Sequence, residues 1–384
     1  MEQSYPVTGS DQFVPARLQI ARHARGLKQI ELAEAIGRAP PLLSKWESDS
    51  YDNAPDSAAV AALSAKLRVS ASWFYKPITS SLSQPFYRSL KSELNRARDK
   101  LSARLTFVDA IHESLTERVE FPDEDVPDLL GATDFRLLRY EDIDRVARQA
   151  REFWGLGDDP IDDLLMVIEN AGVVIGEDLV ESSKLDGVSA WSSRGVPMML
   201  LAKDKNVGVR RRFDAAHELG HIVLHRSVTK ADFDEHFTLV EEQAMAFASA
   251  FLLPASSFVS DIRDTNLDEF ADKKPKWKVS IGAMIKRLER LHLISSDYAR
   301  NLWKYYSYRQ WRGCEPFDDA IEVERPVNLK TALELVAEEG RAEILDLLRD
   351  VGLLPSDIHE LTGIERRLLE PPMREKPRLK LVGN

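Results

Sequence analysis

Two histidines four residues apart, His217 and His221, constrain this chain more than any other feature. They lie in the segment FDAAHELGHIVLH, whose apolar residues recur at helical spacing. On an α-helix, residues four positions apart share a face and are one turn apart, so both imidazoles can reach a single ion. The segment is therefore predicted to be a buried helix that carries two ligands of a metal ion.

Glu218 follows the first histidine and points away from the metal direction, so we expect it to act as a base rather than as a ligand. A zinc ion in such a site lowers the pKa of a bound water to roughly 7, and a neighbouring carboxylate can take the proton. The alternative is a chance occurrence of HELGH on a structural helix. The close-packing face that carries Ala216 and Gly220 favours the metal site.

A zinc site of this kind needs a third protein ligand. A histidine ten residues after the first is one known solution, but Ser227 stands at that position. The other solution takes a glutamate from the next helix, and the segment EEQAMAFASAFLLP follows the histidines. Glu241 is preferred because it shares the helix face of Ala244 and its apolar neighbours, and Glu242 remains the alternative.

Three further residues have candidate roles near this site. His225 lies one turn beyond the second histidine and is expected in the core or behind the ligands. His236, expected in a connecting loop, is either a stabiliser of an oxyanion or a solvated side chain. The single cysteine, Cys314, is expected to be structural or incidental, because thiolate zinc sites need several cysteines.

The segments RRRFDAAHELGHIVLH and EEQAMAFASAFLLP together resemble the ImmA/IrrE family of metallopeptidases. The matching positions are Arg212, Phe213, Ala216 to His221, Glu241, Ala244, Phe247, Ala248 and Leu252 to Pro254. The sequence departs from the family at Met245, where Asn or Asp is usual and would support the ligands. The resemblance extends upstream to about residue 135. It implies a zincin-like domain with Zn²⁺, and members with known activity cut a repressor protein and so switch on genes.

Residues 13–77 contain short amphipathic helices separated by Gly26 and Gly37. The apolar positions that pack two of them at a steep angle, in a helix-turn-helix arrangement, are Leu32, Ala33, Ile36, Leu43 and Trp46. The stretch resembles the XRE family of phage-repressor-type domains, with VSASWFYKP as its last helix. The resemblance implies binding to double-stranded DNA, with Gln29 at a phosphate. Its base-reading helix would present Pro41, Leu42, Ser44 and Lys45.

The charge of the chain leaves a second function open for this region. Residues 1–77 hold nine Lys/Arg against eight Asp/Glu, and the whole chain has a net charge of −11, so a general basic field is absent. The segment from Ala39 to Leu42 offers few hydrogen-bonding groups to bases, although apolar groups can contact thymine methyls. DNA binding is favoured, and a protein-interaction module is the alternative.

The predicted architecture is α+β and mostly helical, with a small sheet in the zincin-like domain. Strands are predicted at 173–179, 187–193 and 197–203. The predicted order is a helix-turn-helix domain at 13–77, a helical linker at 80–127, the peptidase domain at 135–256, a helical region at 257–370 and a disordered tail at 371–384. An extended substrate could pair with a strand within 187–201, or that strand could simply fill the sheet.

The absence of a signal peptide and of an apolar run of the ~18 residues that span a bilayer predicts a cytoplasmic protein without a membrane partner. A Lys/Arg-rich stretch at 273–290 is interpreted as a solvated helix face, with contact to nucleic acid or substrate as the alternative. The oligomeric state is open, and a homodimer is one candidate.

These observations favour a DNA-associated regulatory zinc metalloendopeptidase that cuts a repressor-like or antitoxin-type partner. A non-enzymatic regulator or antitoxin, with the zincin fold as a sensing or interaction body, is the main alternative. The intact Glu218 argues against it, because a structural zinc site needs no base, whereas Met245 argues for it. A zinc hydrolase of small amides is a third candidate, for which a helix-turn-helix partner is less natural.

Overall fold

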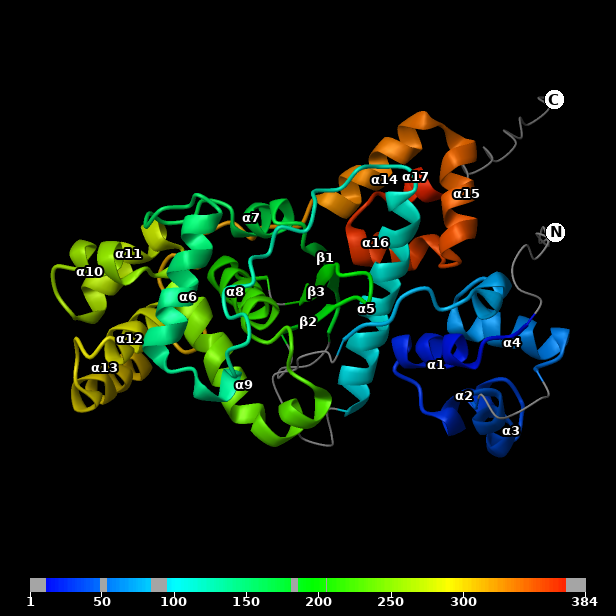
Figure 1. Ribbon diagram of the computed structural model, residues 1–384, viewed down its shortest axis with the longest axis horizontal. Helices are drawn as coiled ribbons and strands as arrows, with labels where there is room; N and C mark the ends of the chain where they lie inside the picture. The colour runs from blue at the N-terminus through cyan, green and yellow to red at the C-terminus, as the bar shows by residue number, and fades with distance from the viewer. Residues whose placement is uncertain (1–11, 49–53, 84–94, 181–185, 205, 371–384) are drawn as a thin grey trace, which may run out of the picture.

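The computed structural model describes residues 12–48, 54–83, 95–180, 186–204 and 206–370. The fold is mostly helical with one small sheet, which confirms the predicted α+β class. In Figure 1 the long helix α5 stands between the sheet with its helices on one side and the N-terminal helices on the other. The tail at 371–384, predicted to be disordered, lies outside the described residues.

The N-terminal helices form a compact unit held by a buried ion pair. Its elements are α1 (Pro15–Ala24), α2 (Gln29–Ala35), α3 (Pro40–Trp46), α4 (Ser57–Leu67) and the 3₁₀-helix η1 (Ala71–Tyr75). Arg22 on α1 donates two hydrogen bonds, of 2.6 and 2.8 Å, to the carboxylate of Glu47 just after α3. Such a paired contact fixes both distance and orientation. The last helix of the unit, predicted in VSASWFYKP, is present as the 3₁₀-helix η1.

The sheet confirms the three predicted strands. They are β1 (Val174–Asp178), β2 (Gly187–Trp191) and β3 (Pro197–Ala202), in the order β1-β3-β2. β1 runs parallel to β3, and β2 runs antiparallel to it. At the last residue of β2, the carbonyl of Trp191 accepts from the backbone N–H of Ser83 at 2.6 Å. The segment from Ser81 to Ser83 therefore lies along this end of β2.

The two faces of the sheet belong to two different cores, because successive strand residues point to opposite faces. Met199 and Leu201 of β3 pack in the core that holds α8 (Gly208–Leu224) and α9 (Lys230–Leu252). Met198 and Leu200 pack in the core that holds α5 (Asn95–Thr116). β3 is buried on both sides, and its sequence PMMLLA is accordingly a continuous apolar run.

α5 was predicted within a linker, and the structure places it at the centre of the molecule. The α1 helix, the sheet and α15 (Arg341–Val351) all pack on it. Its Arg104 is buried and donates to Asp178 of β1 at 2.7 Å and to Asp357 of α16 (Pro355–Thr362). Arg25, from the end of α1, also binds Asp357 at 2.7 Å. α5 therefore joins the N-terminal unit, the sheet and the C-terminal helices.

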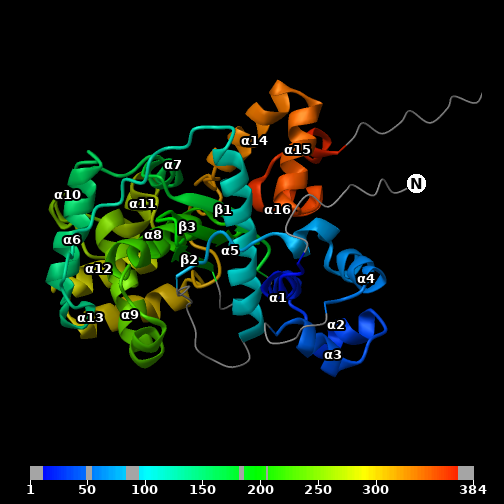
Figure 2. The ribbon, with the colours of Figure 1, turned by 45° about the vertical axis from the view of Figure 1, so that its right-hand side comes forward.

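The remaining helices fall into two groups. Those on the side of α8 are α6 (Tyr140–Phe153), α7 (Leu164–Asn170), α10 (Ala255–Asp261), α11 (Leu267–Trp277), α12 (Ile281–Arg290) and α13 (Ser296–Tyr308). α14 (Asn328–Glu339), α15, α16 and α17 (Arg366–Leu369) form the second group. Figure 2 shows the second group and the N-terminal unit on the same side of α5.

The Lys/Arg-rich stretch at 273–290 is not a solvated face throughout, so that interpretation is wrong for two of its members. Lys274 is fully buried, 2.8 Å from Glu315 and 2.5 Å from Asp318. Arg287 is buried and binds Asp144 at 2.7 Å. These charges stabilise contacts between helices, because each is paired within the protein.

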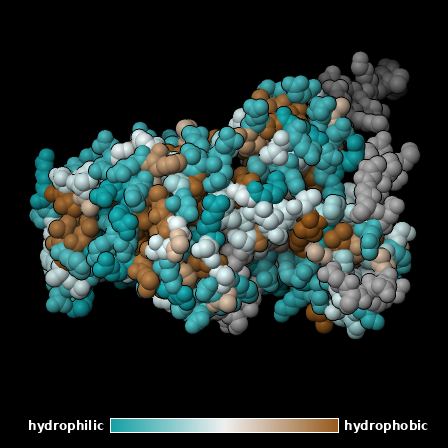
Figure 3. All heavy atoms as spheres, in the orientation of Figure 1, coloured by the Kyte–Doolittle hydropathy of each residue, from teal (hydrophilic) through white to brown (hydrophobic). Residues whose placement is uncertain are grey.

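The face of the molecule in Figure 3 is mostly hydrophilic, with apolar residues in separate small patches. Among the described residues, no single helix is both long and apolar enough to cross a membrane. α9 and α10 meet the length and composition requirement only when taken together, across a bend of 61°.

Candidate metal centre

The candidate centre forms where α8 and α9 pack closely. A Cβ atom at Gly220 of α8 would lie 3.1 Å from the carbonyl oxygen of Ala244 and 3.3 Å from the Cβ of Phe247 on α9. Glycine therefore allows the two helices a closer approach than a larger residue would. Because Glu241 lies one turn before Ala244, this approach brings its carboxylate to the histidines of α8.

Three ligand atoms converge at this contact. The Nε2 atoms of His217 and His221 are 3.1 Å apart. Oxygens of Glu241 lie 3.5 Å from the Nε2 of His217 and 3.3 Å from that of His221. Tetrahedral ligands at ~2.0–2.1 Å from zinc are about 3.3–3.4 Å from one another, so this donor set fits a zinc ion. Glu242, the alternative ligand, is exposed instead.

Burial sets the charge of the cluster. It lowers the pKa of His221 to about 4, so this imidazole is neutral at neutral pH. Burial alone would raise the pKa of Glu241, but the two imidazoles beside it hold that pKa below its ordinary value. Neutral imidazoles and an ionised carboxylate are the forms in which these side chains bind metals.

Glu218 lies on the sheet side of α8, outside the three-residue cluster. The hydroxyl of Ser189 on β2 donates to its Oε2 at 2.6 Å, and its Oε1 lies 3.1 Å from where a Cβ of Gly187 would be. Burial raises the pKa of Glu218 to about 7, against the effect of the Ser189 hydrogen bond. A carboxyl group with such a pKa can both accept and return a proton near neutral pH.

A row of hydrogen bonds lies behind the cluster. The Nδ1 atoms of His221 and His225 are 3.0 Å apart, and the Nε2 of His225 is 3.0 Å from the Oε1 of Gln243. Gln243 in turn donates through Nε2 to the carbonyl of Phe135 at 2.6 Å. His225 is thus buried in the core, behind the candidate ligand His221, as its spacing predicted.

Two polar residues of the site were missed from sequence. The position of Ser189 could have been inferred from the sequence, because alternation in GVSAW puts Gly187 and Ser189 on one face of the strand. Gln243 had none, since its partners come from α8 and from a segment 108 positions earlier in the chain. Met245, the departure from the family pattern, is half-buried, and Arg290 donates to its carbonyl at 3.2 Å.

His236 does not lie in a loop, so that expectation is wrong. It falls within α9 at a kink, with φ −111° and ψ 24°. Its ring makes an edge contact with Phe135, with the ring centroids 5.9 Å apart. His236 thus lies where two helical segments of α9 meet, and Glu241 belongs to the second of these segments.

Four of the five candidate DNA-binding residues lie on α3, and the fifth, Gln29, begins α2. Pro41, Ser44 and Lys45 are exposed, and Leu42 is half-buried. Gln29, at the start of α2, donates through Nε2 to Glu47 at 2.7 Å, so the Arg22–Glu47 pair also orients its amide. The structure therefore leaves Pro41, Ser44 and Lys45 of α3 accessible and ties Gln29 to Glu47, the residue that follows α3.

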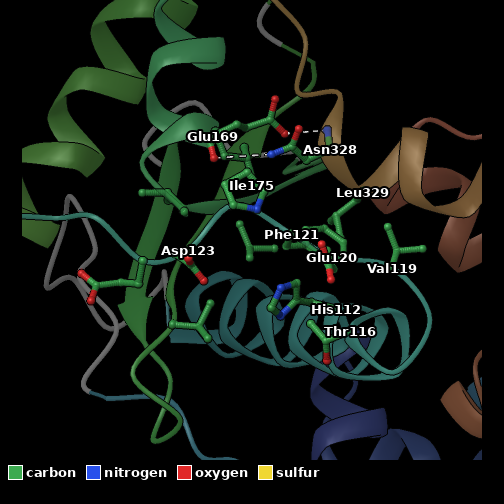
Figure 4. A pocket seen from close by; sticks show the side chains of 16 residues that line it. His112, Thr116, Val119, Glu120, Phe121, Asp123, Glu169, Ile175, Asn328 and Leu329 are labelled. Carbon is green, nitrogen blue, oxygen red and sulfur yellow. Dashed lines mark hydrogen bonds between the residues drawn. The ribbon is translucent and has the colours of Figure 1, made fainter. Parts of the chain in front are cut away.

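A separate cavity of about 580 Å³ lies where α5, β1 and the start of α14 meet (Figure 4). Glu169 accepts backbone hydrogen bonds of 2.9 Å from Val327 and Asn328, and so caps α14. Burial raises the pKa of Glu169 to about 7, although these hydrogen bonds oppose it. The described residues that line the cavity do not include His217, His221 or Glu241, so the cavity is separate from the candidate centre.

Two regions of the chain match models of known protein families. Residues 168–289 match the Peptidase M78 model, described as an IrrE N-terminal-like domain. Residues 18–74 match a helix-turn-helix model. No curated protein matches the chain. The chain thus contains an N-terminal, XRE-type helix-turn-helix domain, followed in sequence by an IrrE/ImmA-like Peptidase M78 domain.

Proposed function

We propose that this protein is a DNA-associated regulatory zinc metalloendopeptidase that hydrolyses a peptide bond in a partner regulator, a repressor-like or antitoxin-type protein. His217, His221 and Glu241 hold Zn²⁺, and Glu218 is the general base. The observation that carries the proposal is the convergence of three ligand atoms within 4.8 Å of one another, with a buried carboxyl group of raised pKa beside them.

A bound zinc ion would polarise a carbonyl group and make a water molecule more acidic. The residues of the chain then have separate tasks. Ser189 occupies Oε2 of Glu218, which leaves Oε1 as the atom that takes a proton from the attacking water. The same carboxyl group then donates that proton to the departing amine.

The edge of the sheet supports a polypeptide substrate. Next to β2, the backbone N–H of Ser192 donates to the carbonyl of Val196, and that of Ala202 donates to the carbonyl of Asp186. The backbone N–H and C=O groups of the even-numbered residues of β2 therefore point toward β3. The backbone groups of Gly187 and Ser189 consequently face the outer edge of the sheet. A peptide that pairs with them would lie next to Glu218, which accepts from Ser189 and has its Oε1 3.1 Å from the Cβ position of Gly187. A small amide would make no use of this edge, which disfavours that alternative.

The helix-turn-helix domain supplies the regulatory part of the proposal. A domain of this type binds double-stranded DNA with its second helix in the major groove. Here that helix is α3, whose outer face is accessible. The non-enzymatic alternative leaves the contact of Glu218 with Ser189 unexplained, because a structural zinc site does not need an oriented base.

The test combines zinc content with cleavage of regulators encoded by neighbouring genes. Wild type and Glu218→Gln should bind equal amounts of zinc, and only wild type should cleave. The loss should be about 10²–10⁴-fold, the usual contribution of general acid–base catalysis. Glu242→Gln changes an exposed neighbour of the ligand Glu241 and should cleave like wild type. Cleavage by Glu218→Gln at the wild-type rate would refute the proposal.

A further inference from the structure

The row of hydrogen bonds behind His221 has only one consistent set of donors and acceptors. It begins at the backbone carbonyl of Phe135, which can only accept. The nitrogen of the Gln243 amide must therefore face this carbonyl, at 2.6 Å. The amide oxygen of Gln243 then faces His225, whose Nε2 is 3.0 Å away.

This orientation fixes the proton on each imidazole. An amide oxygen can only accept, so the Nε2 of His225 carries a hydrogen, and in a neutral ring its Nδ1 is then an acceptor. The Nδ1 of His221, 3.0 Å from that acceptor, must carry the next hydrogen. The Nε2 of His221 is left with a lone pair, and this atom faces His217 and Glu241.

We propose that Gln243, through His225, holds His221 in the tautomer that presents an unprotonated Nε2 to the metal. Gln243 and His225 are positioning residues, since they act through a ligand and do not reach the reacting atoms. The reverse tautomers would turn the amide oxygen of Gln243 toward the carbonyl of Phe135, or leave two acceptors facing each other at His225. Each arrangement leaves buried polar groups unsatisfied.

The location of these side chains agrees with such a role. His225 has no exposed surface and Gln243 is 2% exposed, so water does not replace either partner. Ligating histidines generally donate their second N–H to a carboxylate or carbonyl group. Here an imidazole and an amide transmit that function from Phe135, which precedes α8 and α9 in the chain. Zinc affinity is thereby coupled to the packing of the segment around Phe135 against α9.

The experiment measures the zinc dissociation constant of the full chain by competition with a chelator. Gln243→Leu removes the acceptor for His225 and should raise this constant about 10- to 100-fold. Gln243→Glu keeps an acceptor for His225 but loses the donor to Phe135, so it should raise the constant clearly less than Gln243→Leu does. Equal losses in both variants would show that Gln243 only anchors α9, and would overturn the proposal. Glu242→Leu, on the exposed face of α9, is the matched control and should bind zinc like wild type.

Nitrogen-15 NMR of labelled histidines provides a readout on the unaltered chain, independent of how any variant folds. His225 should carry its proton on Nε2 and His221 on Nδ1. A proton on Nδ1 of His225 would contradict the proposal. The inference rests on the proposed zinc site, but the two can fail separately. Wild type that binds zinc and cleaves nothing refutes the peptidase, whereas Gln243→Leu with wild-type zinc affinity refutes only the positioning role.

Discussion

The two faces of the central sheet differ in what their polar groups do. On the α8 face, Ser189 and Gly187 lie close to the carboxyl group of Glu218, beside the candidate metal cluster. On the α5 face, the buried charge of Arg104 joins Asp178 of the sheet to Asp357 of the C-terminal helices. The α8 face therefore carries the proposed general base, and the α5 face carries a buried ion pair that joins distant parts of the chain.

β1 places a buried ion pair on each face of the sheet, at two consecutive residues. Glu177 binds Arg211 of α8, and also Arg325 at 2.9 Å, whereas Asp178 binds Arg104 of α5. Their side chains point to opposite faces because strand residues alternate. We expect changes at Arg104 to affect the stability of the fold, and changes at Gly187 or Ser189, beside Glu218, to affect the proposed reaction.

The largest expected effect comes from the α5 face. Arg104→Met leaves the carboxylates of Asp178 and Asp357 buried without this partner, and should lower the free energy of unfolding by about 3–5 kcal/mol. Urea unfolding measures this loss. Arg96→Met, on the same helix, removes an exposed contact of 3.3 Å with Glu31 and should cost no more than about 1 kcal/mol. Equal stability of the two variants would contradict the role given to Arg104.

The contact of α7 with α14 should make stability depend on pH. The pKa of Glu169 in the fold, about 7, is above its ordinary value of 4.5. Its protonated form therefore stabilises the fold fully below pH 4.5, and this stabilisation is lost as the pH rises through about 7. Glu169→Gln should remove a change on the order of 2 kcal/mol between these limits. Unfolding curves of both proteins at several pH values test this, and parallel pH dependences would refute it.

A small change on the α8 face should affect the reaction more than the fold. Gly187→Ala places a Cβ atom 3.1 Å from Oε1 of Glu218 and 3.1 Å from the carbonyl oxygen of Leu200. Displacing this carboxylate should lower kcat/KM by about tenfold or more, while the zinc content stays unchanged. The melting temperature should shift only slightly, because β2 retains its pairing with β3. A strongly destabilised variant with normal kcat/KM would reverse the assignment of this face.

The smallest expected effect lies in the N-terminal domain. Lys45 is exposed on α3, and Lys45→Ala should weaken duplex binding and reduce the slope of log affinity against log salt by about 1 if the side chain meets a phosphate. Titrations with upstream DNA at two salt concentrations measure the slope. If wild type binds no upstream sequence at low salt, the domain is a protein-interaction module.

Helical periodicity and residue chemistry were sufficient to predict part of this structure. The spacing of His217 and His221, and the apolar face of the next helix, located a cluster that the structure brings together. Periodicity also indicated the helix within the predicted linker, but not its central place. That place depends on the contacts of Arg104 with partners 74 and 253 positions away, and local patterns carry no information on such pairs.

Zinc content is the most direct test of the central claim, that His217, His221 and Glu241 together hold a zinc ion. Elemental analysis of wild type, Glu241→Ala and Glu242→Ala, each dialysed against the same zinc buffer, compares a proposed ligand with its exposed neighbour. The account predicts one zinc ion per chain in wild type and in Glu242→Ala, and little or none in Glu241→Ala. Full zinc occupancy in Glu241→Ala, or a wild-type chain that binds no zinc, would contradict it.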